Sequence, residues 1–81
     1  MSGRIPKRVQ ISGRWHEVSE AWAGTLELKE YGGPVKYKTE KPYPVLHPNV
    51  YHVRDTNGNK VGEFDTGTYS SYSGSVTAIE L

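Results

Sequence analysis

The sequence predicts an all-β protein: one small domain of five or six short antiparallel strands, closed into a barrel or a strongly twisted sheet. Its size is that of SH3-like or OB-like domains. Three observations predict this. Val, Ile and Thr, which favour extended backbone, make up 17 of the 81 residues, whereas Ala makes up three. Nine Gly and five Pro interrupt the chain at short intervals. Apolar and polar residues alternate between these interruptions, so at most one short helical turn is expected.

The N-terminal third predicts an arm, a strand and a single helical turn. Residues 1–7 are expected to form a flexible basic arm that precedes one β domain over residues 8–81. Alternation predicts a strand over Arg8–Trp15, with a bulge at Gly13 and with Trp15 in the core. Ser19–Gly24 is expected to form the helical turn, since Ser and Gly suit its two ends.

The middle of the chain predicts a hairpin followed by a connector. Thr25–Tyr31 and the alternating residues from Val35 to Thr39 flank a Gly pair. Pro34 has no N–H to close a two-residue turn, so a wider loop is expected. Glu40–Asn49 contains three Pro residues and is expected to be a semi-extended connector or an edge segment.

The C-terminal half carries the strongest local signal, a turn formed by residues 55–59, Asp-Thr-Asn-Gly-Asn, between two strand-like runs. The bulged form of this turn is preferred, which sets Val53 opposite Val61 and Val50 opposite Phe64. Residues 67–75 are expected to be a flexible polar loop. Residues 76–81 are expected to form a strand. A third functional hypothesis is a structural subunit, in which this strand lies at a sheet edge and pairs with a second copy in a homodimer.

Composition excludes several protein classes. A chain of 81 residues without cysteine is neither a large enzyme nor a disulfide mini-protein, and no stretch is apolar enough for a membrane span. Leu, Ile, Val and Phe total only 16 residues, so aromatic rings are expected to supply much of the core. The protein is expected to be cytoplasmic and not an enzyme, with no catalytic residue, no metal and no cofactor.

One motif resembles a catalytic loop. Residues 64–68, Phe-Asp-Thr-Gly-Thr, resemble the hydrophobic-Asp-Thr-Gly-Thr/Ser loop of aspartic proteases, in which two facing Asp residues share a proton. That family needs a flap and most of its barrel after this loop, and only 16 residues follow Asp65. The resemblance covers five residues, and the favoured interpretation is a turn in which Asp65 accepts hydrogen bonds from nearby backbone N–H groups.

Two further motifs suggest metals and are rejected on spacing. Asp55, Asn57 and Asn59 match the first ligand positions of a calcium loop, but Gly and Glu are missing at its sixth and twelfth positions, so a hairpin turn is favoured. A zinc site built from the three histidines has no spacing that supports it. These are His16, His47 and His52.

The leading functional hypothesis is a small binding module that acts on another protein, as a regulator or an inhibitor such as a phage- or bacterial-type antagonist. Tyr offers large contact area at low entropy cost, and Ser and Gly adapt around it. The candidate contact residues are Trp22, Tyr43, Tyr69 and Tyr72.

The alternative is binding of nucleic acid or a nucleotide, because small β-barrels combine aromatic rings with Lys and Arg. The net charge of +1 hides a segregated pattern, with four positive and no negative side chains before Glu17. Lys36 and Lys38 are expected on one face of a strand. The candidate residues are Arg4, Lys7, Arg8, Arg14, Lys36, Tyr37, Lys38 and Lys41.

Overall fold

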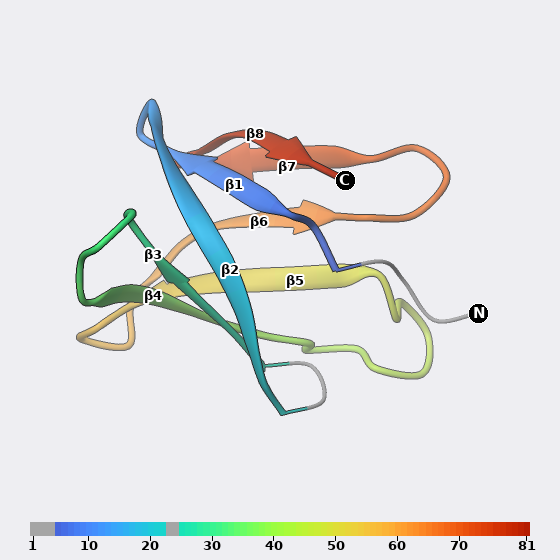
Figure 1. The fold of residues 1–81 in the computed structure, drawn as a ribbon. Helices are drawn as coiled ribbons and strands as arrows, with labels where there is room; N and C mark the ends of the chain where they lie inside the picture. The colour runs from blue at the N-terminus through green and yellow to red at the C-terminus, as the bar shows by residue number, and fades with distance from the viewer. Residues whose placement is uncertain (1–4, 23–24) are drawn as a thin grey trace.

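The computed structural model describes residues 5–22 and 25–81 and has eight antiparallel strands. The strands are β1 (Arg8–Ile11), β2 (Arg14–Trp22), β3 (Thr25–Lys29), β4 (Val35–Glu40), β5 (Val50–Asp55), β6 (Lys60–Asp65), β7 (Ser71–Gly74) and β8 (Val76–Glu80). They form one sheet in the order β7-β6-β5-β4-β3-β2-β1-β8, which curls into a nearly closed barrel (Figure 1). The all-β prediction is confirmed, with more strands than expected.

One additional strand arises because the chain turns within a segment for which the sequence predicts a single strand. Ser12 and Gly13 have φ values of 52° and 80°, so they form a two-residue hairpin turn in which Ile11 pairs with Arg14. The predicted strand over Arg8–Trp15 is therefore wrong. Because the chain reverses at Gly13, Trp15 lies opposite Gln10 on the outer face, so its predicted place in the core is also wrong.

The predicted helical turn is also wrong over its described residues. β2 continues through Glu20 to Trp22, and the last two residues of the prediction lie outside the described part of the chain. The pairs Val18–Leu28 and Glu20–Leu26 join β2 to β3. Ladder partners on β3 continue to Trp22 with one irregularity after Glu20, whereas one isolated helical turn costs more to nucleate than it gains.

The next two predictions are confirmed. β3 and β4 form a hairpin whose loop spans five residues, in which the N–H of Gly33 donates to the carbonyl of Glu30 at 2.8 Å. The Pro-rich segment forms the connector between β4 and β5.

The turn between β5 and β6 has the predicted bulged form but a different register. The N–H of Gly58, at φ 85°, donates to the Asp55 carbonyl at 3.0 Å. The register of the two strands shifts once more between Arg54 and Val53, which sets Val53 opposite Gly62. Both predicted pairs are therefore wrong by one residue. Val50 lies opposite Asp65, and Phe64 lies opposite Tyr51.

The sheet nearly closes through a bent segment that runs from β7 into β8. The N–H of Ser75 donates to the Val61 carbonyl in β6 at 2.8 Å, and its own carbonyl accepts from the N–H of Ser12, also at 2.8 Å. Gly62 and Gly74 face each other at this seam, and a Cβ added to Gly62 would lie 2.7 Å from the Ser73 carbonyl oxygen. The seam therefore requires glycine. β7 also corrects the predicted loop over residues 67–75, whereas the predicted C-terminal strand is confirmed as β8.

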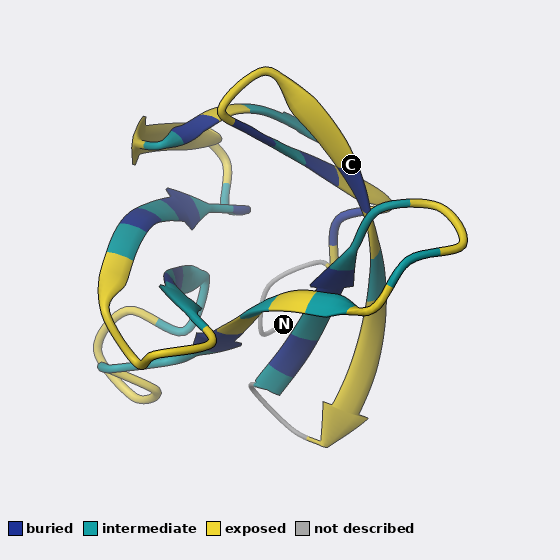
Figure 2. Ribbon diagram, turned by 90° about the vertical axis from the view of Figure 1, so that its left-hand side faces the viewer, coloured by how far each residue is buried: buried dark blue, intermediate teal, exposed yellow. Residues whose placement is uncertain are grey.

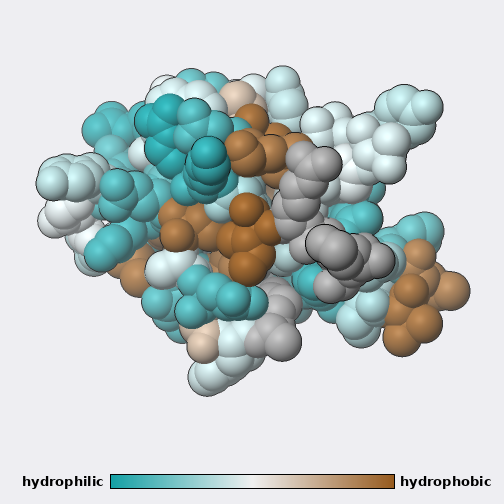
Figure 3. All heavy atoms as spheres, turned by 45° about the vertical axis from the view of Figure 1, so that its right-hand side comes forward, coloured by the Kyte–Doolittle hydropathy of each residue, from teal (hydrophilic) through white to brown (hydrophobic). Residues whose placement is uncertain are grey.

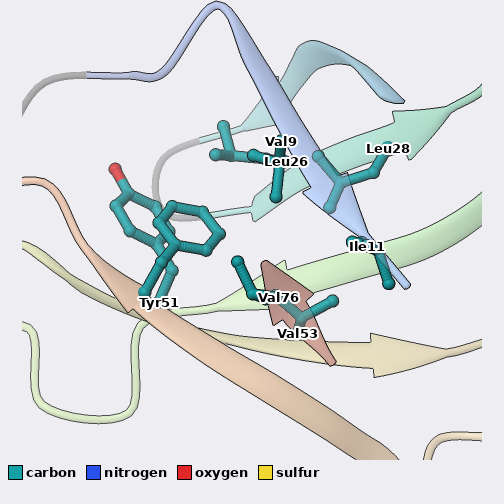
Figure 4. Close-up of a cluster of buried hydrophobic side chains, with 8 residues drawn as sticks. Val9, Ile11, Leu26, Leu28, Tyr51, Val53 and Val76 are labelled. Atoms are coloured by element: carbon teal, nitrogen blue, oxygen red, sulfur yellow. The ribbon is translucent and has the colours of Figure 1, made fainter. Parts of the chain in front are cut away.

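The interior is filled mainly by aliphatic side chains. Figure 2 shows the buried residues along the strands, whereas exposed residues occupy the turns and also most of the strands β2 and β7. Six of the eight residues in the core cluster are aliphatic, but its two largest side chains are rings and Tyr37 packs against it, so aromatic rings supply part of the core. Tyr51 and Phe64 are the two core rings and stack with centroids 5.0 Å apart. In Figure 4 the Tyr51 hydroxyl points away from the aliphatic residues.

The strand order divides the connections between two ends of the barrel. One end, called the terminal end here, holds the start of β1, the end of β2, the β4–β5 and β6–β7 connections and the end of β8. The other, the turn end, holds the β1–β2, β3–β4 and β5–β6 turns (Figure 1). No helix in the described part of the chain is long and apolar enough to cross a membrane.

Candidate functional site

Exposed large hydrophobic side chains are concentrated at the terminal end. Trp22, at the last residue of β2, is 72% exposed, and Tyr69, in the β6–β7 connection, is 88% exposed. Figure 3 shows hydrophobic residues projecting from one side of the molecule and gathered in the middle of the same face. Near this end the structure exposes Ile5, Trp22, Tyr43, Val45, Leu46, Tyr69, Tyr72 and Leu81. The turn end exposes two large rings among its described residues, Tyr31 and, less fully, Trp15 near the start of β2.

The β4–β5 connection is held against the sheet by rings. Tyr43 meets the ring of His47 edge-on at 5.7 Å and that of His52 in β5 at 6.2 Å. The N–H of His47 also donates to the Tyr43 carbonyl at 2.8 Å. Three Pro residues restrict the backbone on both sides. This connection is therefore an ordered projection.

The tip of that projection is apolar. Val45 and Leu46 lie inside the turn closed by Tyr43 and His47, and they are 87% and 80% exposed. Sequence reasoning treated the whole segment as a connector and missed them. The available signal was a Val-Leu pair between Pro44 and Pro48, in a stretch that no neighbouring strand pairs with and buries.

The β6–β7 connection begins with a fixed turn and carries the second exposed group. Asp65 accepts the N–H of Gly67 at 2.7 Å through Oδ1, which confirms the turn interpretation of the protease-like motif. Tyr69 lies in the connection, and Tyr72 lies in β7 opposite Phe64 and is about half exposed. The structure thus places Tyr69 with Trp22 and the β4–β5 projection at the terminal end, and Tyr72 on the strand leading away from it.

Two buried polar atoms at the same end have no hydrogen-bond partner among the described residues. They are Asn49 Oδ1, just before β5, and Thr66 Oγ1, just after β6. The N–H of Thr66 donates to the Asn49 carbonyl at 3.0 Å, so the two residues are neighbours across the strands. Such atoms are commonly satisfied by water or by a polar group of a binding partner.

Charged side chains also lie at the terminal end, where the Arg8–Glu80 pair joins the start of β1 to the end of β8. The Lys41 ammonium lies 5.2 Å from the centre of the Tyr51 ring, a cation–π distance. Burial raises the pKa of the Tyr51 hydroxyl, and the negative charge of Glu20 adds to this. Tyr51 is therefore a neutral donor or acceptor here at neutral pH.

Three of the six predicted basic residues that the structure describes, Arg8, Arg14 and Lys36, are paired with carboxylates. Arg8 reaches both oxygens of Glu80, at 2.9 and 3.1 Å, and its guanidinium lies 4.6 Å from the centre of the Trp15 ring. The predicted Arg4 lies outside the described residues.

Glu30 pairs with two more of these residues. It accepts from Arg14 at 3.0 Å and from Lys36 at 2.6 Å. These hydrogen bonds, the one from Lys36 being the stronger cause, lower the pKa of the Glu30 carboxyl. Three of the predicted basic residues are thus compensated in space.

The remaining basic candidates lie apart from one another. Lys7 is anchored through its backbone N–H to the Glu80 carbonyl at 2.6 Å. Lys38 lies on the outer face of β4 with Lys36, as predicted, and Tyr37 points inward, half-buried, against the core. No group of three or more metal-ligating side chains is present among the residues described.

The three histidines do not converge. His16 is buried on β2, where Nδ1 lies 2.8 Å from the Arg14 carbonyl and the ring meets Tyr37 edge-on at 5.3 Å. The calcium-like motif is a hairpin turn, as expected, because Asp55 Oδ1 accepts the N–H groups of Asn57 and Asn59 at 2.9 and 3.0 Å.

The chain matches no protein-family model, no curated protein and no solved structure, so its function is argued from its own geometry.

Proposed function

We propose that this protein is a small binding module without chemistry of its own, and that it acts as a regulator or inhibitor by attaching to another protein through its terminal end. The observation that supports this most strongly is the β4–β5 projection, an ordered turn that presents Val45 and Leu46 to solvent. Exposed apolar groups gathered in one region, rather than scattered singly, are typical of interaction surfaces.

The chemistry of this end favours a protein partner. Trp and Tyr are among the side chains most enriched at interface hot spots, and here Trp22 and Tyr69 are exposed at the same end as the aliphatic tip. Burying one exposed Val or Leu fully is worth about 1.5–3 kcal/mol. The rings of Tyr43 and His47 already order the tip, so little conformational entropy is lost on binding.

Nucleic acid is the less favoured partner for this end. Phosphate recognition needs cations that are free to exchange their counterions. At this end Arg8 already contacts Glu80, and the Lys41 ammonium lies over the Tyr51 ring.

The test is affinity capture from a cell extract with nuclease present, comparing Tyr69→Ser with Tyr31→Ser. Both tyrosines are 88% exposed and lie in connections at opposite ends, so they form a matched pair. We expect the unaltered chain and Tyr31→Ser to retain the same protein, whereas Tyr69→Ser and the double variant Val45→Ser/Leu46→Ser lose it. Capture that disappears on nuclease treatment, or that both tyrosine variants weaken equally, would contradict the proposal.

A further inference from the structure

The sheet has two edges, β7 and β8, and these two strands follow each other directly in the chain (Figure 1). Strands β1 to β6 each have a hydrogen-bonded neighbour on both sides. No ladder joins β7 to β8 in the described part of the chain, so the barrel stays open along this line. Backbone groups on a free strand edge are ready to pair with another strand.

The edge of β8 is protected against such pairing, and that of β7 is not. An extra residue, Thr77, interrupts the ladder of β8 with β1, and Glu80 places a charge at the end of the strand. A bulge and a charge are two of the features by which native edges avoid other strands. β7, Ser71–Gly74, has no charged residue and no Pro, and its ladder with β6 runs without a shift. All four of its residues are exposed, so only its short length limits pairing.

One hydrogen bond determines which way the β7 backbone points. The N–H of Ser75 donates to the Val61 carbonyl at 2.8 Å, next to the cross-strand pair of Gly62 and Gly74. In an antiparallel ladder, a bond in this position means that the two residues of the pair turn their own N–H and C=O groups away from each other. Tyr72, two residues earlier, has the same orientation. Its N–H and C=O therefore point to the free side of β7, where an added strand would bond to both.

The inner face of this edge is apolar. Tyr72 lies opposite Phe64, which is buried in the core, so the two rings share the inner face of the sheet. Phe64 is 1% exposed and Tyr72 is 49% exposed. The difference arises because β7 has no strand on its far side. An apolar side chain on an added strand would cover the exposed part of the Tyr72 ring.

The outer face of the same edge favours a basic side chain. Ser71 lies there, opposite Asp65 in β6. Asp65 has no Lys, Arg or His nitrogen within 4.0 Å among the described residues, whereas the neighbouring Glu63 already pairs with Lys60 at 2.8 Å. Because Ser71 is small, a Lys or Arg on the next strand could extend over it toward the Asp65 carboxylate.

We infer that β7 receives an extended strand of the partner protein along its free edge, with an apolar side chain beside Tyr72 and a basic one directed toward Asp65. Strand addition of this kind is a recurring mode of peptide recognition. The inference rests on the proposed function, because the strand is the partner's. It is also continuous with that interface, since Tyr69 lies two residues before β7 and is 88% exposed.

A second copy of the chain is the less favoured occupant of this edge. It would offer its own β7, and two four-residue strands bury far less than the roughly 1,200 Å² of a stable interface. A partner that also contacts the terminal end does not have this limit.

The first test is an NMR titration of the full chain with a five-residue probe, acetyl-Lys-Val-Thr-Val-Lys-amide. Its Val side chains share one face and its Lys side chains the other. We expect the amide signals of Tyr72 and Ser73 to shift, and those of Thr77 in β8 to stay unchanged.

Methylated versions of the same probe test whether its backbone makes the contact. One version carries N-methyl groups on both Val residues, and the other carries one on Thr, so each blocks hydrogen bonding along a different edge of the peptide. One of the two should bind about tenfold more weakly than the unmethylated probe, and which one it is shows the direction of the added strand. Equal binding of all three probes, or no localised shift, would overturn the inference.

Two variants of Tyr72 separate the strand edge from the ring. Both Tyr72→Thr and Tyr72→Pro remove the ring, but only Pro also removes the N–H, which makes no bond to β6. Tyr72→Pro should bind the probe about tenfold more weakly than Tyr72→Thr. Equal affinity of the two folded variants would refute strand addition, and if Tyr72→Pro does not fold, the methylated probes decide on the unaltered chain.

The outcomes also distinguish this inference from the proposed function. If methylation has no effect while Tyr69→Ser still loses the captured protein, the interface stands and strand addition is wrong. If methylation weakens the probe while Tyr69→Ser and Tyr31→Ser capture equally, the free edge stands and the protein interface is wrong. A dimer in sedimentation that Tyr72→Pro abolishes and Tyr72→Thr retains would assign the edge to a second copy and refute the inference.

Discussion

The chain changes direction at both ends of the barrel, but different side chains hold the connections at the turn end and at the terminal end. At the turn end the connections satisfy themselves: Asp55 caps its own turn, and Glu30 joins Arg14 to Lys36. At the terminal end Asp65 caps the β6–β7 connection in the same way, but the β4–β5 connection is held by rings, and the apolar groups of Val45 and Leu46 have no neighbours that bury them. The difference teaches that polar groups in a small barrel can complete each other locally, whereas exposed apolar area gains its stabilisation only from something outside the chain.

The largest loss of stability is expected at the seam around Gly62 and Gly74, which holds both ends of the barrel in one sheet. Gly62→Ala places a methyl group 2.7 Å from the Ser73 carbonyl and 3.1 Å from the Ser75 nitrogen. The loss in unfolding free energy should be about 2–3 kcal/mol, measured by urea denaturation. Ser71→Ala on the exposed face of β7 is the control and should change little. Equal stability of the two variants would show that the seam does not need glycine.

A smaller effect is expected from loosening the turn end alone. Asp55→Ala removes the acceptor of two backbone N–H groups, which should cost about 1–2 kcal/mol of unfolding free energy. Asp55→Asn keeps an acceptor oxygen and should retain most of this. Amide chemical shifts should change around residues 55–59 and not in the β4–β5 projection. Changes that spread to Tyr43 and Leu46 would show that the two ends are coupled.

The ion-pair cluster of the turn end makes stability depend on pH. The pKa of the Glu30 carboxyl is lowered in the folded state, so its stabilisation is complete above the unfolded value, near 4.5, and is lost as pH falls through the lower folded value. Glu30→Gln should therefore lower Tm modestly at neutral pH, and the difference from the unaltered chain should disappear in strong acid.

Salt provides the second check on this cluster. High salt should shrink the neutral-pH difference in Tm, because exposed pairs are screened. A difference that persists unchanged in acid and in salt would assign the role of Glu30 to packing rather than charge.

The smallest effect on stability is expected from the feature on which the proposed function depends most. Val45→Ser/Leu46→Ser removes side chains that contact little in the free protein, so the unfolding free energy should change by less than about 0.5 kcal/mol. Binding of the partner protein should nevertheless be lost. A large loss of stability would instead identify these residues as structural.

Part of the candidate site was visible in the sequence. Trp22, Tyr43 and Tyr69 were selected because large rings stood among polar, small or Pro residues, and all three are exposed. Val45 and Leu46 were missed because aliphatic residues are normally assigned to the core, and nothing in a single sequence shows that a connector leaves them outside. Trp15 was misplaced because one unrecognised turn at Ser12 reverses which residues share a face.

The sequence by itself determined the all-β class, the hairpins around residues 30–34 and 55–59, and the shared outer face of Lys36 and Lys38. These depend on backbone preferences and side-chain alternation, which act over a few residues. Only the tertiary structure decided how the barrel closes at Gly62 and Gly74, and which carboxylates compensate the basic residues. Arg8 and Glu80 are 72 residues apart in the chain, and such partners meet only after the sheet has curled and set its register. The separation of a polar end from an apolar one has the same origin, because strand order, not local sequence, decides which connections lie together.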